Sequence, residues 1–267
     1  MGPGLKPNEA DIRQWPAPNK RRWQLSVRGL MKLVFALACI FAAISVLNRG
    51  ERPGERARRA QCANNLKQIA MALDSYRGQY GAHPPAYVAD ATGRPMHSWR
   101  VLLLPFLDAQ SLYDQYDFRE PWNGPNNSKL LATMPAVFGC PSQPPTQPNH
   151  TNYAVITGPG TMFPGTASVE IEDVTDGLSE TLMVVEVANV NIPWTAPVDL
   201  DVRTMSFQIN DLKHPGLSSM HIEGAQVALG DARVFWLMED APAKTLRAAT
   251  TIAGGEKIER VDMLRAK

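Results

Sequence analysis

The longest apolar stretch of the chain lies near its N-terminus. From Leu33 to Leu47 only Ser45 interrupts the apolar residues, and the 18 residues that begin at Leu30 make roughly 27 Å of helix. The hydrocarbon core of a bilayer is about 30 Å thick, so the segment spans it if Lys32 extends its ammonium group to the headgroups. The pattern predicts a transmembrane helix at residues 29–48, after a disordered leader at residues 1–28.

Two other interpretations of this stretch stay open. A cleaved secretory signal has a similar apolar run, although no clear small-residue cleavage site closes this one. A buried helix of a soluble protein is the second, but this run is apolar on all faces. Basic residues flank the run on both sides, so charge alone does not set its orientation in a membrane.

Apolar residues at three- and four-residue steps follow this run. They predict an amphipathic helix from about Glu55 to Gln79, which Gly81 and the pair Pro84-Pro85 end. The helix needs a downstream surface on which to bury its apolar stripe. The stripe consists of Cys62, Leu66, Ile69, Ala70, Leu73, Tyr76 and Tyr80.

The remaining pattern is that of short strands and long loops. Tyr153–Thr157 and the apolar run at 181–188 are strand-like, and residues 226–229 and 233–237 form the two arms of a hairpin. Gly230 and Asp231 between these arms suit a two-residue type II′ turn with Gly230 at the position of positive φ. We therefore expect an α+β fold in which the amphipathic helix covers one face of an antiparallel sheet.

Composition and charge exclude several classes of protein. The 267 residues carry 27 Lys plus Arg and 26 Asp plus Glu, so a nucleic-acid partner is not expected. Three cysteines are too few for a disulfide-dense small protein or a four-cysteine zinc site.

Motifs of catalysis are missing from the sequence. No HExxH, Cys-x-x-Cys or G-x-S-x-G pattern occurs, and no Gly-Lys-Ser/Thr follows the glycines at 158 and 160. We therefore expect neither an enzyme nor a cofactor or metal. His221 is expected to hydrogen-bond across the base of the hairpin, towards Asp231 or to a neighbouring backbone carbonyl. Asp199 and Asp201 are expected to be solvated loop charges, and the tryptophans are expected to pack in the core.

Several separate motifs, in order, resemble a known bacterial family. They cover residues 58–88, 97–127, 138–142 (FGCPS), 175–188 (TDGLSETLMVVEVA) and 221–237 (HIEGAQVALGDARVFWL). The chain from about residue 28 to 238 is similar to the family called domain of unknown function 1559, whose members are pilin-like, membrane-anchored exported proteins. A solute-binding label has also been attached to that family.

The chain departs from the family pattern at two places. Family members commonly carry a glutamate at the fifth position after a glycine cleavage site, and Val34 stands there after Gly29. The family's C-terminal signature is a histidine, nine residues and Asp-Gly. His221 and Asp231 keep this spacing, but Ala232 replaces the glycine, and we expect Gly230 to take over its backbone role.

The resemblance implies a domain order and a location. The leader would be cytoplasmic, the transmembrane helix would continue into the amphipathic helix, and residues 49–238 would form a periplasmic or extracellular pilin-like head, followed by an extension at 239–267. An exported head makes Cys62 and Cys140 natural disulfide partners, with two unpaired buried thiols as the alternative.

The function that the resemblance implies is that of an envelope or surface protein without enzymatic activity. Its expected partners are the lipid bilayer and other pilin-like or envelope proteins. A periplasmic or surface solute-binding module is the alternative.

Overall fold

The computed structural model describes residues 31–32, 34–38, 53–144 and 148–256. The predicted leader at 1–28 and most of the predicted transmembrane helix lie outside these residues, although 31–32 and 34–38 are helical. No helix within the described part of the chain is long and apolar enough to cross a membrane. The chain divides into two units, Met1–Gly50 and Glu51–Lys267, and the second holds the fold described below.

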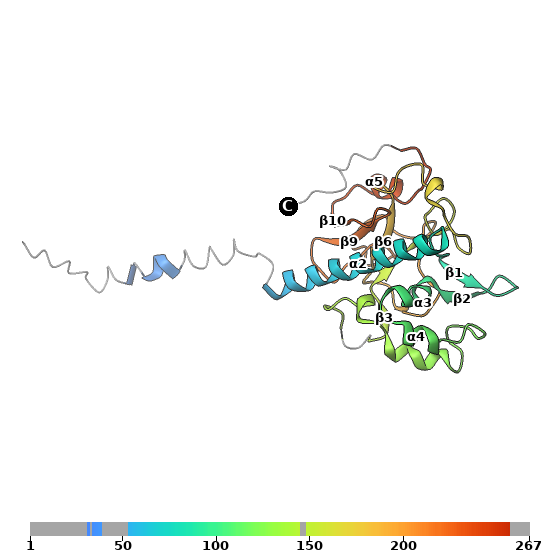
Figure 1. Cartoon of the computed structure of the whole chain (residues 1–267). Helices are drawn as coiled ribbons and strands as arrows, with labels where there is room; N and C mark the ends of the chain where they lie inside the picture. The colour runs from blue at the N-terminus through green and yellow to red at the C-terminus, as the bar shows by residue number, and fades with distance from the viewer. Residues whose placement is uncertain (1–30, 33, 39–52, 145–147, 257–267) are drawn as a thin grey trace, which may run out of the picture. The chain divides into compact units, whose positions relative to one another are not determined.

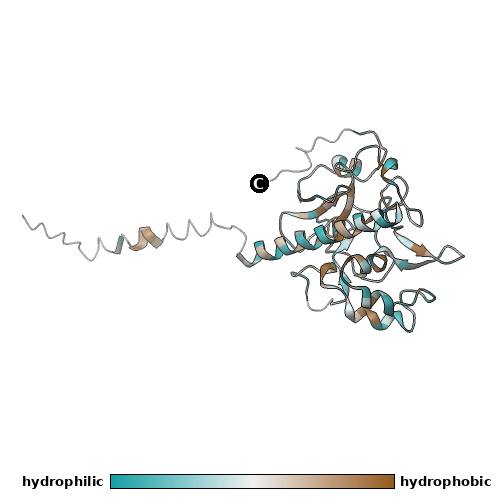
Figure 2. Cartoon of the chain, viewed as in Figure 1, coloured by the Kyte–Doolittle hydropathy of each residue, from teal (hydrophilic) through white to brown (hydrophobic). Residues whose placement is uncertain are grey.

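The predicted amphipathic helix is confirmed as α2 (Pro53–Tyr80). Its buried stripe contains Cys62, Leu66, Ile69 and Leu73, all with no exposed surface. Hydrophobic and hydrophilic residues alternate along the helix (Figure 2), as expected for one face in a core and one in solvent. Gly81 ends it with φ 87°, and the Gly81 N–H donates to the Arg77 carbonyl.

Helix α2 lies across a four-stranded antiparallel sheet (Figure 1). The strand order is β10-β9-β6-β4, and every neighbouring pair is antiparallel. The sheet confirms the predicted α+β class. Its strands are β4 (Tyr153–Ala154), β6 (Leu182–Glu186), β9 (Gly224–Leu229) and β10 (Val234–Met238).

Both faces of this sheet are buried. Val184 and Ala228 face the core that includes the apolar stripe of α2. Val185 and Val227 face a second core, which contains Leu246 of helix α5 (Ala243–Ala248). Residues beyond 238, expected to be an extension past the family match, therefore complete the core of the head.

Short elements surround the main sheet. The predicted strand at 153–157 is split, since β5 (Ile156–Thr157) leaves the main sheet to pair in parallel with β8 (Leu200–Asp201). The antiparallel pairs are β1 (Tyr87–Ala89) with β2 (Pro95–Ser98) and β3 (His150–Thr151) with β7 (Ile192–Pro193). The helices are α3 (Trp99–Leu102), α4 (Gln110–Gln115) and the 3-10 segments η2 (Leu104–Phe106), η3 (Asn127–Thr133), η4 (Ala136–Phe138) and η5 (Ile171–Asp173).

The hairpin of β9 and β10 is confirmed, but its predicted turn is wrong. The loop has three residues, 230–232, and the positive φ of 60° belongs to Ala232 rather than to Gly230. Such loops end in a left-handed residue, the position at which glycine is preferred. Gly230 is required for another reason, because a Cβ there would lie 3.0 Å from the carbonyl oxygen of Leu178.

Candidate functional site

Four potential metal-ligating side chains meet at the N-terminal half of α2. Cys62 lies on α2, Cys140 follows η4, Glu186 is the last residue of β6, and His221 precedes β9. One ligand atom from each lies within 4.8 Å of all the others, and all four residues are buried. The fold therefore concentrates two thiols, an imidazole and a carboxyl group in a small volume that solvent does not reach.

The two cysteines lie together without a bond. Their sulfur atoms are 2.9 Å apart, whereas a disulfide requires about 2.05 Å, and both cysteines are free. The expected Cys62–Cys140 disulfide is thus corrected to a contact between two free thiols. This outcome matches the alternative of two unpaired buried thiols.

The two sulfurs make a hydrogen-bond contact with each other. The hydrogen bond that Cys62 donates to Cys140 raises the pKa of Cys62 and lowers the pKa of Cys140. Burial opposes ionisation of both, but Cys140 also faces His221 and the Ser142 N–H, with its sulfur 3.4 Å from that nitrogen. Cys140 is therefore the thiol that ionises first.

His221 bridges the cysteines and an acid on α2. Its Nε2 lies 3.2 Å from the Cys62 sulfur and 3.6 Å from the Cys140 sulfur. Its Nδ1 pairs with Glu55 in the first turn of α2, so the predicted contact towards Asp231 is wrong. Burial alone would lower the pKa of His221, but its bonds to Cys140 and Glu55 raise it to about 9. The same bond lowers the pKa of Glu55.

Glu186 is a buried acid with an unused oxygen. Its Oε2 accepts a 3.0 Å hydrogen bond from the Gln226 N–H, while its Oε1 has no hydrogen-bond partner among the described residues. Burial raises the pKa of Glu186 to about 7. A buried carboxyl oxygen without a partner is unusual, and a ligand or an ion is one common reason for it.

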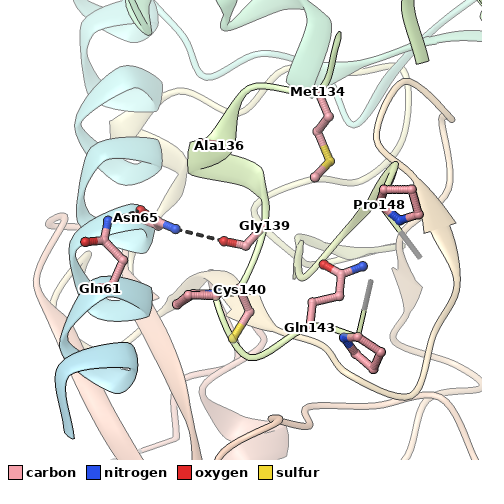
Figure 3. A pocket seen from close by; sticks show the side chains of 10 residues that line it. Gln61, Asn65, Met134, Ala136, Gly139, Cys140, Gln143 and Pro148 are labelled. Atoms are coloured by element: carbon pink, nitrogen blue, oxygen red, sulfur yellow. Dashed lines mark hydrogen bonds between the residues drawn. The ribbon is translucent and has the colours of Figure 1, made fainter. Parts of the chain in front are cut away.

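Backbone contacts fix Cys140 beside α2. The Cys140 N–H donates to the Asn152 side chain at 2.7 Å, and the Asn65 amide donates to the Gly139 carbonyl at 2.9 Å. A pocket of about 430 Å³ lies between α2 and the residues around Cys140 (Figure 3). Gln61 and Asn65 of α2 line it from one side. The other lining residues are Met134, Ala136, Gly139, Cys140, Pro141, Gln143, Pro144 and Pro148.

The other sequence-predicted site residues are placed elsewhere. Asp231 bonds to the N–H of Arg233 and so shapes the hairpin loop, as Gly230 does by its close approach to Leu178.

Sequence reasoning missed the two acids of the site. Glu186 could have been identified as a candidate, because it is the one charged residue in an eight-residue apolar strand pattern at 181–188. Glu55 could not have been identified in this way, because an acid in the first turn of a helix is expected from its favourable interaction with the helix dipole alone.

Comparison with known proteins gives a family and no described activity. The family described as "Protein of unknown function (DUF1559)" matches residues 53–211, more than half of the chain. The match includes Cys62, Cys140 and Glu186 and ends before His221. No curated protein and no solved structure matches the chain. The chain belongs to the DUF1559 family.

Proposed function

We propose that this protein is a membrane-anchored, exported, pilin-like protein that acts through contacts with other envelope or surface proteins. The observation that carries the proposal is the apolar run from Leu30 to Leu47, which leads within a few residues into α2. Such a run, with basic residues on both sides, is typical of a single membrane span. The N-terminus lies in the cytoplasm and the head on the far side of the membrane.

The way α2 is held supports an anchoring role. A helix that transmits force from an anchor must be fixed firmly in the head. Leu66, Ile69 and Leu73 are fully buried against the sheet, and Lys67 donates to the Ala232 carbonyl at 2.7 Å. The arrangement of a long N-terminal helix on an antiparallel sheet is the one expected of a pilin-like protein.

The burial of the cysteines supports a role without catalysis. A catalytic cysteine must reach its substrate, so it lies in a partly exposed environment. Cys62 has no exposed surface and Cys140 is 5% exposed. We accordingly propose a role in which neither cysteine acts as a nucleophile.

In-cell crosslinking tests the proposed contacts. Cells that produce the full-length protein are treated with an amine-reactive crosslinker, and sheared surface material is collected in parallel. We expect crosslinked species larger than the monomer, or the protein itself in sheared filaments. Recovery of the monomer alone by both methods would contradict a role in protein contacts.

The pocket beside Cys140 favours a second candidate, a solute-binding module. Its volume of about 430 Å³ falls in the range of small-molecule sites, and the amides of Gln61 and Asn65 lie at its wall. A thermal-shift screen with sugars and short peptides tests this candidate. A rise in melting temperature that Asn65→Leu abolishes would support it, and no shift with any compound would contradict it.

A further inference from the structure

The group formed by Cys62, Cys140, Glu186 and His221 offers four donor atoms from four separate segments of the chain. The shortest separations are 2.9 Å between the sulfurs and 3.2 Å from His221 Nε2 to the Cys62 sulfur. Each residue is at most 5% exposed. Chance clusters of acids occur at protein surfaces, but this cluster is buried and contains thiols and imidazole as well.

Glu186 has a buried oxygen that no donor satisfies among the described residues. Its residue is 1% exposed and its Oε1 makes no hydrogen bond within the described part of the chain. A buried carboxylate is costly unless a donor or a cation compensates it. The Gln226 N–H holds the other oxygen, and a carboxyl oxygen of Glu186 lies within 4.8 Å of both sulfurs and of a ring nitrogen of His221.

His221 is held as metal-bound histidines are held. Ligating histidines almost always donate their second ring N–H to a carboxylate or a carbonyl, which fixes the tautomer and the ring orientation. Here Glu55 accepts from Nδ1, and Nε2 faces both sulfurs. Glu55 thus orients His221 without being near enough to the sulfurs to be a ligand itself.

We propose that Cys62, Cys140, Glu186 and His221 bind one zinc(II) ion as a closed structural site. Zinc takes four ligands of these types in tetrahedral geometry, with sulfur at about 2.3 Å and nitrogen or oxygen at about 2.0–2.2 Å. The two sulfurs must then separate to about 3.8 Å, the distance that tetrahedral angles and these bond lengths require. Both thiols release their protons to solvent when the ion binds, and so do Nε2 of His221 and the carboxyl group of Glu186 where these are protonated.

The donor set decides between zinc and other occupants. Magnesium and calcium prefer sites made of oxygen ligands alone, which this site is not. A disulfide would use the two sulfurs and leave Oε1 of Glu186 without a partner. Zinc satisfies all four side chains, and it would tie α2 to the end of β6 and to two loops that lie far apart in sequence. The inference goes beyond the proposed function and does not depend on membrane anchoring.

Metal content of the reduced full-length protein tests the site. The protein is extracted in detergent with a reductant, loaded with zinc, dialysed and analysed for bound metal. We expect one zinc per chain, a raised melting temperature and, with cobalt(II) in place of zinc, the visible bands of tetrahedral thiolate coordination. Cys62→Ser, Cys140→Ser and Glu186→Gln should each abolish or sharply weaken binding.

Two further variants make the result specific. Cys39→Ser removes the remaining cysteine of the sequence and should leave zinc binding unchanged. Glu55→Gln changes the support of His221, together with the ion pair of Glu55 with Arg58, and should weaken zinc binding by about 10- to 100-fold. Circular dichroism of every variant shows whether it is folded.

Three outcomes would overturn the proposal. The first is a folded, reduced protein that retains no zinc. The second is bound zinc that Cys62→Ser and Cys140→Ser leave unchanged. The third is a protein whose two buried thiols remain joined as a disulfide under reductant, which intact-mass measurement detects.

Discussion

Arg100 and Asp199 form an ion pair in the middle of the head. Their side chains are 0% and 2% exposed and lie 2.6 Å apart. Asp199 also accepts from the Trp99 indole and from the Val155 N–H, while Arg100 donates to the Tyr153 carbonyl. The pair therefore joins α3 to the split between β4 and β5.

Removing one member of this pair should destabilise the fold strongly. Asp199→Ala leaves the Arg100 guanidinium buried without a counter-charge, and we expect a loss of about 3–5 kcal/mol in the free energy of unfolding. Arg119→Ala is the matched control, because Arg119 pairs with Asp117 but is 91% exposed, and it should cost less than about 1 kcal/mol. Denaturant titration followed by tryptophan fluorescence measures both, and equal effects would contradict the role of burial.

His83 should make stability depend on pH. It is 1% exposed, neither ring nitrogen has a partner among the described residues, and burial, with Arg77 nearby, lowers its pKa from 6.5 to about 4. The unfolded chain then binds more protons between pH 6.5 and 4, so stability is full above pH 6.5 and falls as the pH drops to 4. The loss amounts to about 3 kcal/mol at most.

His83→Leu tests this dependence. Leucine has no proton to bind, so the variant should lose less stability than the wild type between pH 6.5 and pH 4. If the stability of His83→Leu falls between pH 6.5 and pH 4 as steeply as that of the wild type, His83 is not the group responsible for the pH dependence.

The sequence pattern did not predict these buried charges. Asp199 was expected to be a solvated loop charge, and Glu186 was not singled out, yet both are buried. The partners of each lie far away in sequence: Asp199 bonds to Arg100, and Glu186 to the backbone of Gln226. Local periodicity shows which face of an element is apolar but does not show which polar side chain a distant segment will meet.

At the scale of elements, the hairpin loop shows which positions need special backbone conformations. Ala232 has φ 60°, a conformation that costs an L-residue with a Cβ roughly 1–2 kcal/mol. The family signature has glycine at this position. Here Ala232 adopts the left-handed conformation that glycine favours, at the expense of strain in one residue.

Ala232→Gly should stabilise the protein. Relief of the strain should outweigh the lost methyl contact and the greater freedom of the unfolded chain, for a net gain of up to about 1 kcal/mol. Ala248→Gly, within α5, should instead destabilise by about 0.5–1 kcal/mol. Thermal unfolding compares the two, and a lower melting temperature for Ala232→Gly would support the two-residue turn that the sequence alone suggested.

Elements were predictable where their pattern is local and strong. Helix α2, strand β6 and both arms of the hairpin were found within a few residues, because each has a clear apolar period. The turn was placed wrongly because glycine favours positive φ but does not require it. The break between β4 and β5 depends on a bond from Val155 to the distant Asp199, which no local pattern reveals.

At the scale of the whole molecule, the proposed membrane anchoring depends on the apolar run at residues 30–47. Two arginines at its centre, Ala38→Arg with Ile40→Arg, should prevent stable insertion, since each costs roughly 2.5–3.5 kcal/mol at the middle of a span. Ala38→Leu is the matched control and should insert as the wild type does. Cell fractionation measures the outcome, and membrane retention of the double-arginine variant would contradict a spanning role for the run.

The most direct test of the account is the location of the unaltered full-length chain in bacterial cells. Membranes are washed at alkaline pH to remove peripheral proteins, and protease is added to cells whose outer layers have been opened. We predict that the chain stays in the washed membranes and that the protease digests the head while the cytoplasm remains sealed. A full-length chain in the soluble cytosolic fraction, protected from the protease, would contradict the account.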